Sequence, residues 1–323
     1  MKNNLPSYVS MCLCGSRLWI KIFTLSVILV SCNNTHLLKE IKKLDHYPSA
    51  SGIEYFNKQF FVIGDDANDL LVLDSNFNIA DSISIYSFPK KRIPKTIKPD
   101  LESILLTRDG KLLLLGSGSL SPYRNVCWLI DPITKEKDST PLDTFYQRLK
   151  YNGITEINIE GATSIPGSII LSNRGHKAYR RNYLVFTNSH FWNNQQEAPI
   201  DLILIGSNPD TAEFNGISGI SYAPKSDRLI MTVSTENTSS AYDDGTIGKS
   251  YLWIVNSISS KKRWKSINPN QVIDLNAVDA RFKGQKIESV CVVKETKHFL
   301  HLVLAADNDD GSSTLFKVLV EKN

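Results

Sequence analysis

Five short segments of the sequence begin with an oxygen-bearing side chain, and the same kind of segment recurs along the chain. In "LESILL", which starts at Leu101, a glutamate stands at the entrance of an apolar run, and a turn and a second apolar run, "GKLLLLG", follow. Equivalent segments place an oxygen donor at the same point each time. The aligned residues are Ser51, Glu102, Glu160, Ser218 and Glu288. Three carboxylates and two hydroxyls at equivalent positions indicate a common site.

The segments belong to repeated four-strand units. A third apolar run follows each pair, as in "DLLVLD" from Asp69 and "YLVFTN" from Tyr183, and a weaker fourth run follows in four of the five units. The fifth unit lacks its fourth run, and "HLLKEIKKLD" from His36 can supply it. Such repetition is typical of propeller blades. We predict an all-β, five-bladed β-propeller closed by the N-terminal strand, with a six-bladed propeller as the alternative.

Composition supports this fold class and excludes one class of partner. Hydrophobic residues make up 41% of the chain and charged residues 22%, which is ordinary for a globular protein. β-Branched and aromatic residues gather in short runs between Gly, Asn, Asp and Pro, and no long helical pattern follows the N-terminus. The net charge of +4 is small, and no stripe of basic and aromatic residues occurs, so we expect no nucleic-acid partner.

The N-terminal segment predicts a targeting signal. Arg17 and Lys21 flank the apolar run "IFTLSVILVSC", which is short for a membrane span and ends at Cys32. The run resembles the lipobox of bacterial lipoproteins, which implies cleavage before Cys32 and acylation of that residue, with palmitate or a similar chain. An ordinary secretory signal or an uncleaved anchor is the alternative, and translation can start at Met1 or Met11.

The predicted organisation is a signal peptide over residues 1–31, a lipid-anchored linker over 32–35 and one propeller domain over 36–323. The expected location is the bacterial outer membrane, with the propeller facing the periplasm or the cell surface. Only Cys127 and Cys291 then remain, each inside an apolar strand, and we expect two buried thiols. No CxxC spacing occurs, which argues against zinc.

A propeller brings equivalent positions together around its axis, so the three glutamates would repel one another. At ~5 Å and an effective dielectric constant of ~20, each pair costs roughly 3 kcal/mol. Protonation or a bound cation would relieve this repulsion. Oxygen-only ligands favour Ca²⁺, with Mg²⁺ second. Two alternatives stay open: the glutamates could instead cap backbone groups of the neighbouring blade, and Glu54 could replace Ser51 in the first blade.

The order Ser, Glu, Glu, Ser, Glu over five blades resembles the calcium-activated apyrases, which hydrolyse nucleoside diphosphates. Segments that carry the resemblance are "SGIEYFNKQFFVIGDD", "IILSNRG" and "GISGISYAPKSDRLIMTVSTEN". It implies one calcium ion on the axis, held by the five aligned residues. Phytase-like and lactonase-like propellers share the metal ring with six blades. The chain also resembles propeller lipoproteins of Bacteroidota-type bacteria, which implies a surface address.

The ends of the second strands are expected near the metal. Arg124 and Arg174 would bind a phosphate, and Asp65, Asp66 or Glu236 would accept a proton. The alternative is that these acidic residues only form turns. Residues 236–250 are the candidate lid, with a solvent-exposed hairpin as the alternative. The basic segment 90–100 is expected to be a solvated loop, and contact with anionic lipid headgroups near the anchor is the alternative.

Two functions are compatible with these residues and their order. The first is a calcium-dependent hydrolase of phosphate esters or anhydrides with a small phosphorylated substrate. The second is a non-catalytic binding propeller with a structural metal ion. We expect a monomer that contacts the membrane through the lipid at Cys32.

Overall fold

Each repeated segment forms one antiparallel sheet in the computed structural model, which describes residues 36–206, 214–236, 247–307 and 311–322. The first blade contains β2 (Ala50–Phe56), β3 (Gln59–Gly64), β4 (Asp69–Leu73) and β5 (Ile79–Ser84). The second contains β6 (Leu101–Leu106), β7 (Leu112–Gly116), β8 (Val126–Ile130) and β9 (Lys137–Pro141). The third contains β10 (Ile159–Ile165), β11 (Ser168–Asn173), β12 (Asn182–Thr187) and β13 (Asp201–Ile205), and β17 (Ser266–Ile267) adds a short parallel strand.

The last two blades follow the same plan. The fourth contains β14 (Asn215–Ala223), β15 (Arg228–Glu236), β16 (Ile247–Asn256) and β18 (Gln271–Asp274). The fifth contains β19 (Lys286–Glu295), β20 (Phe299–Asp307), β21 (Ser313–Glu321) and β1 (Leu37–Leu44). Short helical segments are α2 (Leu275–Val278), η1 (Ile258–Lys261) and η2 (Ala280–Phe282).

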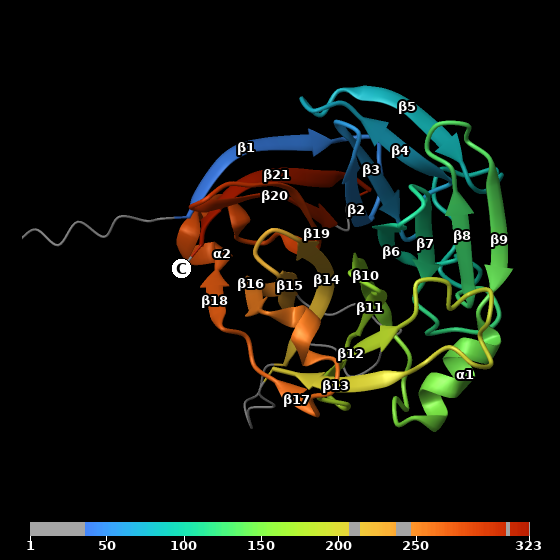
Figure 1. Cartoon of the computed structure of the whole chain (residues 1–323). Helices are drawn as coiled ribbons and strands as arrows, with labels where there is room; N and C mark the ends of the chain where they lie inside the picture. Colours follow the sequence, from blue (N-terminus) through green and yellow to red (C-terminus); the bar gives the residue numbers. More distant parts are fainter. Residues whose placement is uncertain (1–35, 207–213, 237–246, 308–310, 323) are drawn as a thin grey trace, which may run out of the picture. The chain divides into compact units, whose positions relative to one another are not determined.

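The first strands of the five blades form a closed ring. β2 contacts β6, β6 contacts β10, β10 contacts β14, β14 contacts β19, and β19 returns to β2. Figure 1 shows these strands around the centre, with the remaining strands of each blade outside them. The five-bladed prediction is confirmed, and the six-bladed alternative is wrong.

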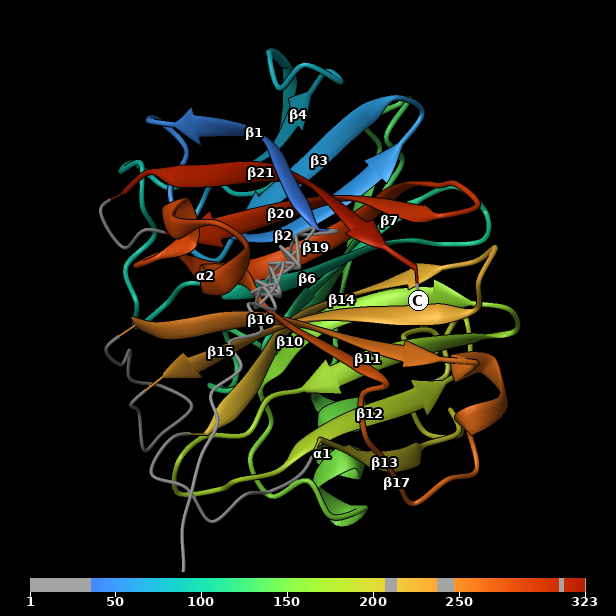
Figure 2. The ribbon, with the colours of Figure 1, turned by 90° about the vertical axis from the view of Figure 1, so that its left-hand side faces the viewer.

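Chain closure also follows the prediction. β1 pairs antiparallel with β21, with Leu37 opposite Leu319 and Leu44 opposite Ser313. Both views show β1 lying along β21 (Figures 1 and 2). One sheet therefore contains both ends of the described chain, and the outer edge of β21 is paired.

The core consists of five apolar clusters, one at each seam between neighbouring blades. Alternation along a strand decides which seam a side chain enters. In β3, Phe60 and Val62 pack against the fifth blade, whereas Phe61 and Ile63 pack against the second. Because both faces of a blade are buried, its inner strands are apolar at consecutive positions.

The longest helix of the described residues was not predicted. Helix α1 (Asp143–Tyr151) joins the second and third blades, and it buries Phe145, Tyr146 and Leu149 in the seam between them. The helix has only nine residues, so its apolar spacing covers little more than two turns. Cys127 and Cys291 are free and buried, as expected. Within the described residues, no helix combines the length and apolar character needed to cross a membrane.

Candidate functional site

All five aligned residues occupy the same structural position, a β-bulge in the first strand of each blade. The pairing of first and second strands skips one residue in every blade. The skipped residues are Ser51, Glu102, Glu160, Ser218 and Glu288. A bulge redirects a side chain out of the regular alternation. The alignment of the repeated segments therefore identified equivalent positions in space.

The two serines join neighbouring blades. The hydroxyl of Ser51 donates to the carbonyl oxygen of Leu101 at 2.5 Å, and that of Ser218 donates to the carbonyl oxygen of Ile287 at 2.6 Å. Each acceptor precedes the bulge glutamate of the next blade. The serines thus bind backbone groups of the neighbouring blade, which was the alternative predicted for the glutamates, although they bind carbonyl groups and not N–H groups.

Two of the three glutamates lie beside internal cations. Arg174 Nη1 is 3.6 Å from Glu160 Oε2 and 3.9 Å from Glu288 Oε2. Lys286 Nζ lies 3.0 Å from Glu288 Oε1, and Asn158 Nδ2 donates to Glu160 Oε1 at 2.6 Å. The structure thus brings Glu160 and Glu288 together around one guanidinium group, which belongs to a residue that is 7% exposed.

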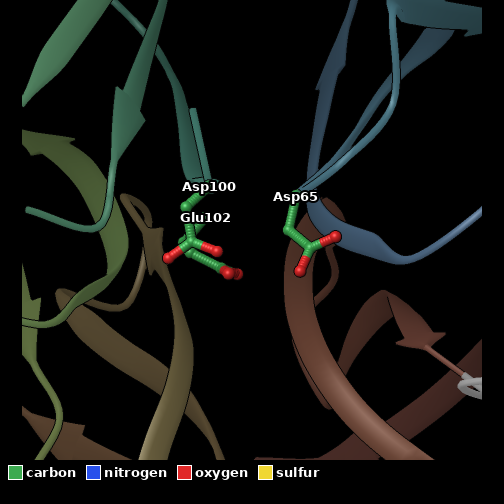
Figure 3. A group of neighbouring side chains, drawn as sticks. All are labelled: Asp65, Asp100 and Glu102. Atoms are coloured by element: carbon green, nitrogen blue, oxygen red, sulfur yellow. The ribbon is translucent and has the colours of Figure 1, made fainter. Parts of the chain in front are cut away.

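The third glutamate belongs to an acidic cluster with two aspartates from other positions. Asp65, Asp100 and Glu102 each offer one carboxylate oxygen, and these atoms lie within 4.8 Å of one another. Figure 3 shows Asp65 facing the other two carboxylates. Glu102 makes no hydrogen bond or ion pair with any residue in the described part of the chain, and Asp65 Oδ1 is buried without a hydrogen-bond partner there.

Two cations pair with the aspartates of this cluster. Lys98 bonds to Asp65 Oδ2 and lies 2.8 Å from Asp100 Oδ1. Arg124 Nη1 lies 2.6 Å from Asp100 Oδ2, which also accepts from Ser117 Oγ at 2.5 Å. Both carboxylate oxygens of Asp100 therefore have partners, whereas those of Glu102 have none among the described residues.

Titration behaviour reflects the burial of these carboxyl groups. Burial, with repulsion from Glu160 and Asp100, raises the pKa of Glu102 well above its usual value. Burial also raises the pKa of Glu160 to about 8, although Arg174 and Lys286 oppose the shift. Burial likewise raises the pKa of Asp65 to about 6, although Lys98 opposes the shift. Without a further cation, burial and mutual repulsion therefore favour the protonated forms of these carboxyl groups.

A pocket of about 270 Å³ opens beside the cluster. Asp65, Lys98 and Lys286 line it together with a second group, which consists of Ser49, Asp66 and Arg92 of the basic linker. In that group, Arg92 Nε lies 2.6 Å from Asp66 Oδ2, and Arg92 Nη2 donates to Ser49 Oγ at 3.2 Å. We call this the mouth pocket; its remaining lining residues are Ile93, Pro94, Lys95 and Asp307.

The structure places two of the other predicted residues near the carboxylates, but none of them lines the mouth pocket among the described side chains. Arg124 and Arg174 lie near the carboxylates, but both are buried in ion pairs and do not line the mouth pocket. Glu54 lies outside the bulge series and accepts from the backbone N–H of Leu106 at 3.2 Å. Glu236 ends β15, but its side chain, most of the candidate lid and Cys32 lie outside the described residues.

Asp100 was not predicted, and the basic linker is mostly exposed, as expected, except at its C-terminal end. Asp100 and Lys286 each stand two residues before a bulge glutamate, and this shared spacing was the available signal. Lys98 was expected to be solvated, but only 12% of its side chain is exposed and it pairs with Asp65 and Asp100. Arg92 is exposed, as expected, although it also pairs with Asp66. Nothing in the local sequence shows which surface a linker covers.

Residues 46–320 match a family described as a family of unknown function, DUF6929. The chain belongs to this family. A search of the curated proteins finds no match. The DUF6929 chain is similar in fold to the glutaminyl cyclase of Myxococcus xanthus, with a TM-score of 0.54 and 9% identity over 89% of this chain and 97% of that one.

A second fold neighbour is an inactive variant of virginiamycin B lyase from Staphylococcus aureus. Its TM-score is 0.42 and its identity 12%, over 87% of this chain and 99% of that one. The comparisons therefore support a propeller of the DUF6929 family, and they do not extend to the predicted apyrase resemblance.

Proposed function

We propose that the acidic cluster of this DUF6929 propeller binds a divalent metal ion through Asp65, Asp100 and Glu102. The observation that carries the proposal is the uncompensated state of the cluster. Three carboxylate oxygens lie within 4.8 Å of one another, and one of the carboxylates, Glu102, has no direct partner among the described residues. A divalent cation would supply the missing charge and would favour the ionised form of Glu102.

The donor set fits Ca²⁺ better than Mg²⁺. All three side chains offer hard oxygen ligands, and the neighbouring mouth pocket leaves room for water molecules to complete the shell. Ca²⁺ accepts six to eight oxygens in irregular arrangements, whereas Mg²⁺ requires a near-ideal octahedron. Ser51 and Ser218 are left out of this ligand set because their hydroxyls already bind carbonyl oxygens.

Melting curves with Ca²⁺, Mg²⁺ or a chelator test the proposal. Calcium at about 100 times its Kd should stabilise the protein by about 2.7 kcal/mol, a rise in Tm of roughly 5 °C or more. Glu102→Gln should abolish this gain. Glu136→Gln is the matched control, since Glu136 is exposed on another surface. An unchanged gain in Glu102→Gln, or no gain in the wild-type protein, would exclude calcium binding at this site.

The candidate reaction is hydrolysis of a phosphate ester or anhydride. Basic side chains line the mouth pocket, and Asp65 and Asp66 line it as candidate proton acceptors. A specific observation favours the alternative, a binding propeller with a structural ion: Arg124 and Arg174, the expected phosphate ligands, are buried in ion pairs. A panel of nucleotides and phosphoesters, assayed with calcium and with chelator, separates the two. No turnover on any compound would favour the binding propeller.

We also propose that the protein is a monomeric lipoprotein of the bacterial outer membrane, anchored at Cys32 and facing the periplasm or the cell surface. The support is the order of basic residues, apolar run, small residue and cysteine in the sequence. Labelling with a palmitate analogue should mark the wild-type protein and not Cys32→Ser. Equal labelling of both would refute the anchor.

A further inference from the structure

The ammonium group of Lys98 occupies one side of the acidic cluster. It bonds to Asp65 Oδ2 and lies 2.8 Å from Asp100 Oδ1, and its side chain is only 12% exposed. Two of the three cluster carboxylates thus share this one cation. Lys98 is the internal counter-ion of the site that we assign to the metal.

A divalent cation would compete with this ammonium group. Metal ligation needs oxygens of Asp65 and Asp100, and the same two carboxylates bind Lys98. Two cations that share ligands repel each other at short range. A metal ion at the cluster would therefore be repelled by Lys98 as long as its ammonium group stays at Asp65 Oδ2 and Asp100 Oδ1.

The mouth pocket gives the side chain of Lys98 space to move away from the cluster. Its backbone is fixed, because its N–H donates to Pro94 O at 2.9 Å and the N–H of Ile93, in the same linker, donates to Asp66 O at 2.9 Å. The four-carbon side chain is flexible and lines the mouth pocket. Two further cations, Arg92 and Lys95, come from the same linker and line the same pocket.

We propose that Lys98 is a displaceable counter-ion that couples metal binding to anion binding. When the metal ion enters, the ammonium moves into the mouth pocket and forms, with Arg92 and Lys95, a site for an oxyanion such as a phosphoryl or carboxylate group. This inference rests on the proposed metal site and adds the ligand class. Because coupling between two ligands is reciprocal, the anion should tighten calcium binding.

Calorimetric titration with calcium tests the coupling, with and without methylphosphonate, a phosphoryl probe that is not hydrolysed. Wild-type protein should bind calcium about fivefold more tightly with the probe, the lower end of usual coupling. Lys98→Met should bind calcium about tenfold more tightly than wild type without the probe, because no ammonium competes, and should gain nothing from the probe. Lys95→Met should reduce the effect of the probe. Acetate in place of methylphosphonate distinguishes a phosphoryl from a carboxylate site.

Lys150→Met is the matched control, since Lys150 is an exposed residue of α1, and it should behave as wild type. If wild type and Lys98→Met bind calcium equally tightly, the displacement is refuted while the metal site stands. If neither binds calcium, the metal site itself is refuted. Should Lys98→Met fail to fold, the wild-type titration decides alone, because a calcium affinity independent of both anions overturns the coupling.

Discussion

At the scale of single residues, the arginines expected to bind phosphate act as counter-ions. Arg174 lies between Glu160 and Glu288, and its Nη2 also donates to Ser234 Oγ at 3.0 Å. Removing one partner of a buried ion pair leaves an uncompensated charge and costs about 3–5 kcal/mol. Arg174→Met should therefore lower the free energy of unfolding in urea by about 3 kcal/mol.

The control is Arg263→Met, which changes an exposed arginine and should leave stability within about 0.5 kcal/mol of wild type. If Arg174→Met were as stable as wild type but no longer bound phosphate compounds, Arg174 would be a ligand-binding residue as first predicted.

Glu54 gives a pH prediction away from the metal ligands. Burial raises its pKa to about 7, although the backbone N–H groups of Tyr55 and Leu106 lower it. A carboxyl group with a raised folded-state pKa stabilises the fold fully below its unfolded pKa, and this contribution is lost as pH rises through about 7. Raising the pH from about 5 to 8 should therefore lower the free energy of unfolding of wild type relative to that of Glu54→Gln, by on the order of 2 kcal/mol. A difference that does not vary over this range would show that Glu54 is ionised throughout.

At the scale of elements, the bulges decide how closely blades approach. The residue after each bulge is Gly or Ser in every blade. A Cβ atom on Gly219 would lie 2.6 Å from the backbone oxygen of Glu288, closer than real contacts permit. The bulge directs one side chain toward the axis or the seam. The Gly or Ser that follows it leaves space for the first strand of the neighbouring blade.

The serine contacts between blades are testable in the same way. Ser218→Ala removes a buried hydroxyl-to-carbonyl bond and should cost about 1–2 kcal/mol in urea denaturation. Ser260→Ala removes an exposed bond of the same type, 2.8 Å long, and should cost little. Equal losses in the two variants would contradict a role for Ser218 in joining blades. Gly219→Ala should be more destabilising than either, because backbone atoms must move.

At the scale of the whole molecule, closure depends on β1. This strand covers the edge of β21, and Leu44 and Leu315 belong to the apolar cluster between the fifth and first blades. A chain that starts at Asp45 would expose an unpaired edge beside that cluster, and such edges pair with other chains. It should elute as oligomers in size-exclusion chromatography, whereas a chain that starts at Asn34 should elute as a monomer. A monomeric, equally stable shortened chain would show that β1 is dispensable.

The sequence by itself determined the blade count, the closing strand and the equivalence of Ser51, Glu102, Glu160, Ser218 and Glu288. These features repeat along the chain, and repetition makes a local pattern comparable with its own copies. The buried state of Cys127 and Cys291 followed from their apolar neighbours. Helix α1 escaped prediction because two turns carry too little periodicity.

Only the tertiary structure decided how the polar residues share the interior. Whether Lys98 lies in solvent or beside Asp65 and Asp100 depends on where a linker of irregular backbone crosses the propeller, and no periodic pattern encodes that path. Likewise, the division of the bulge residues into seam serines and axial glutamates depends on which acceptor or cation each side chain meets from another blade. Such partners are distant in sequence, and their charges interact strongly only because folding removes the water between them.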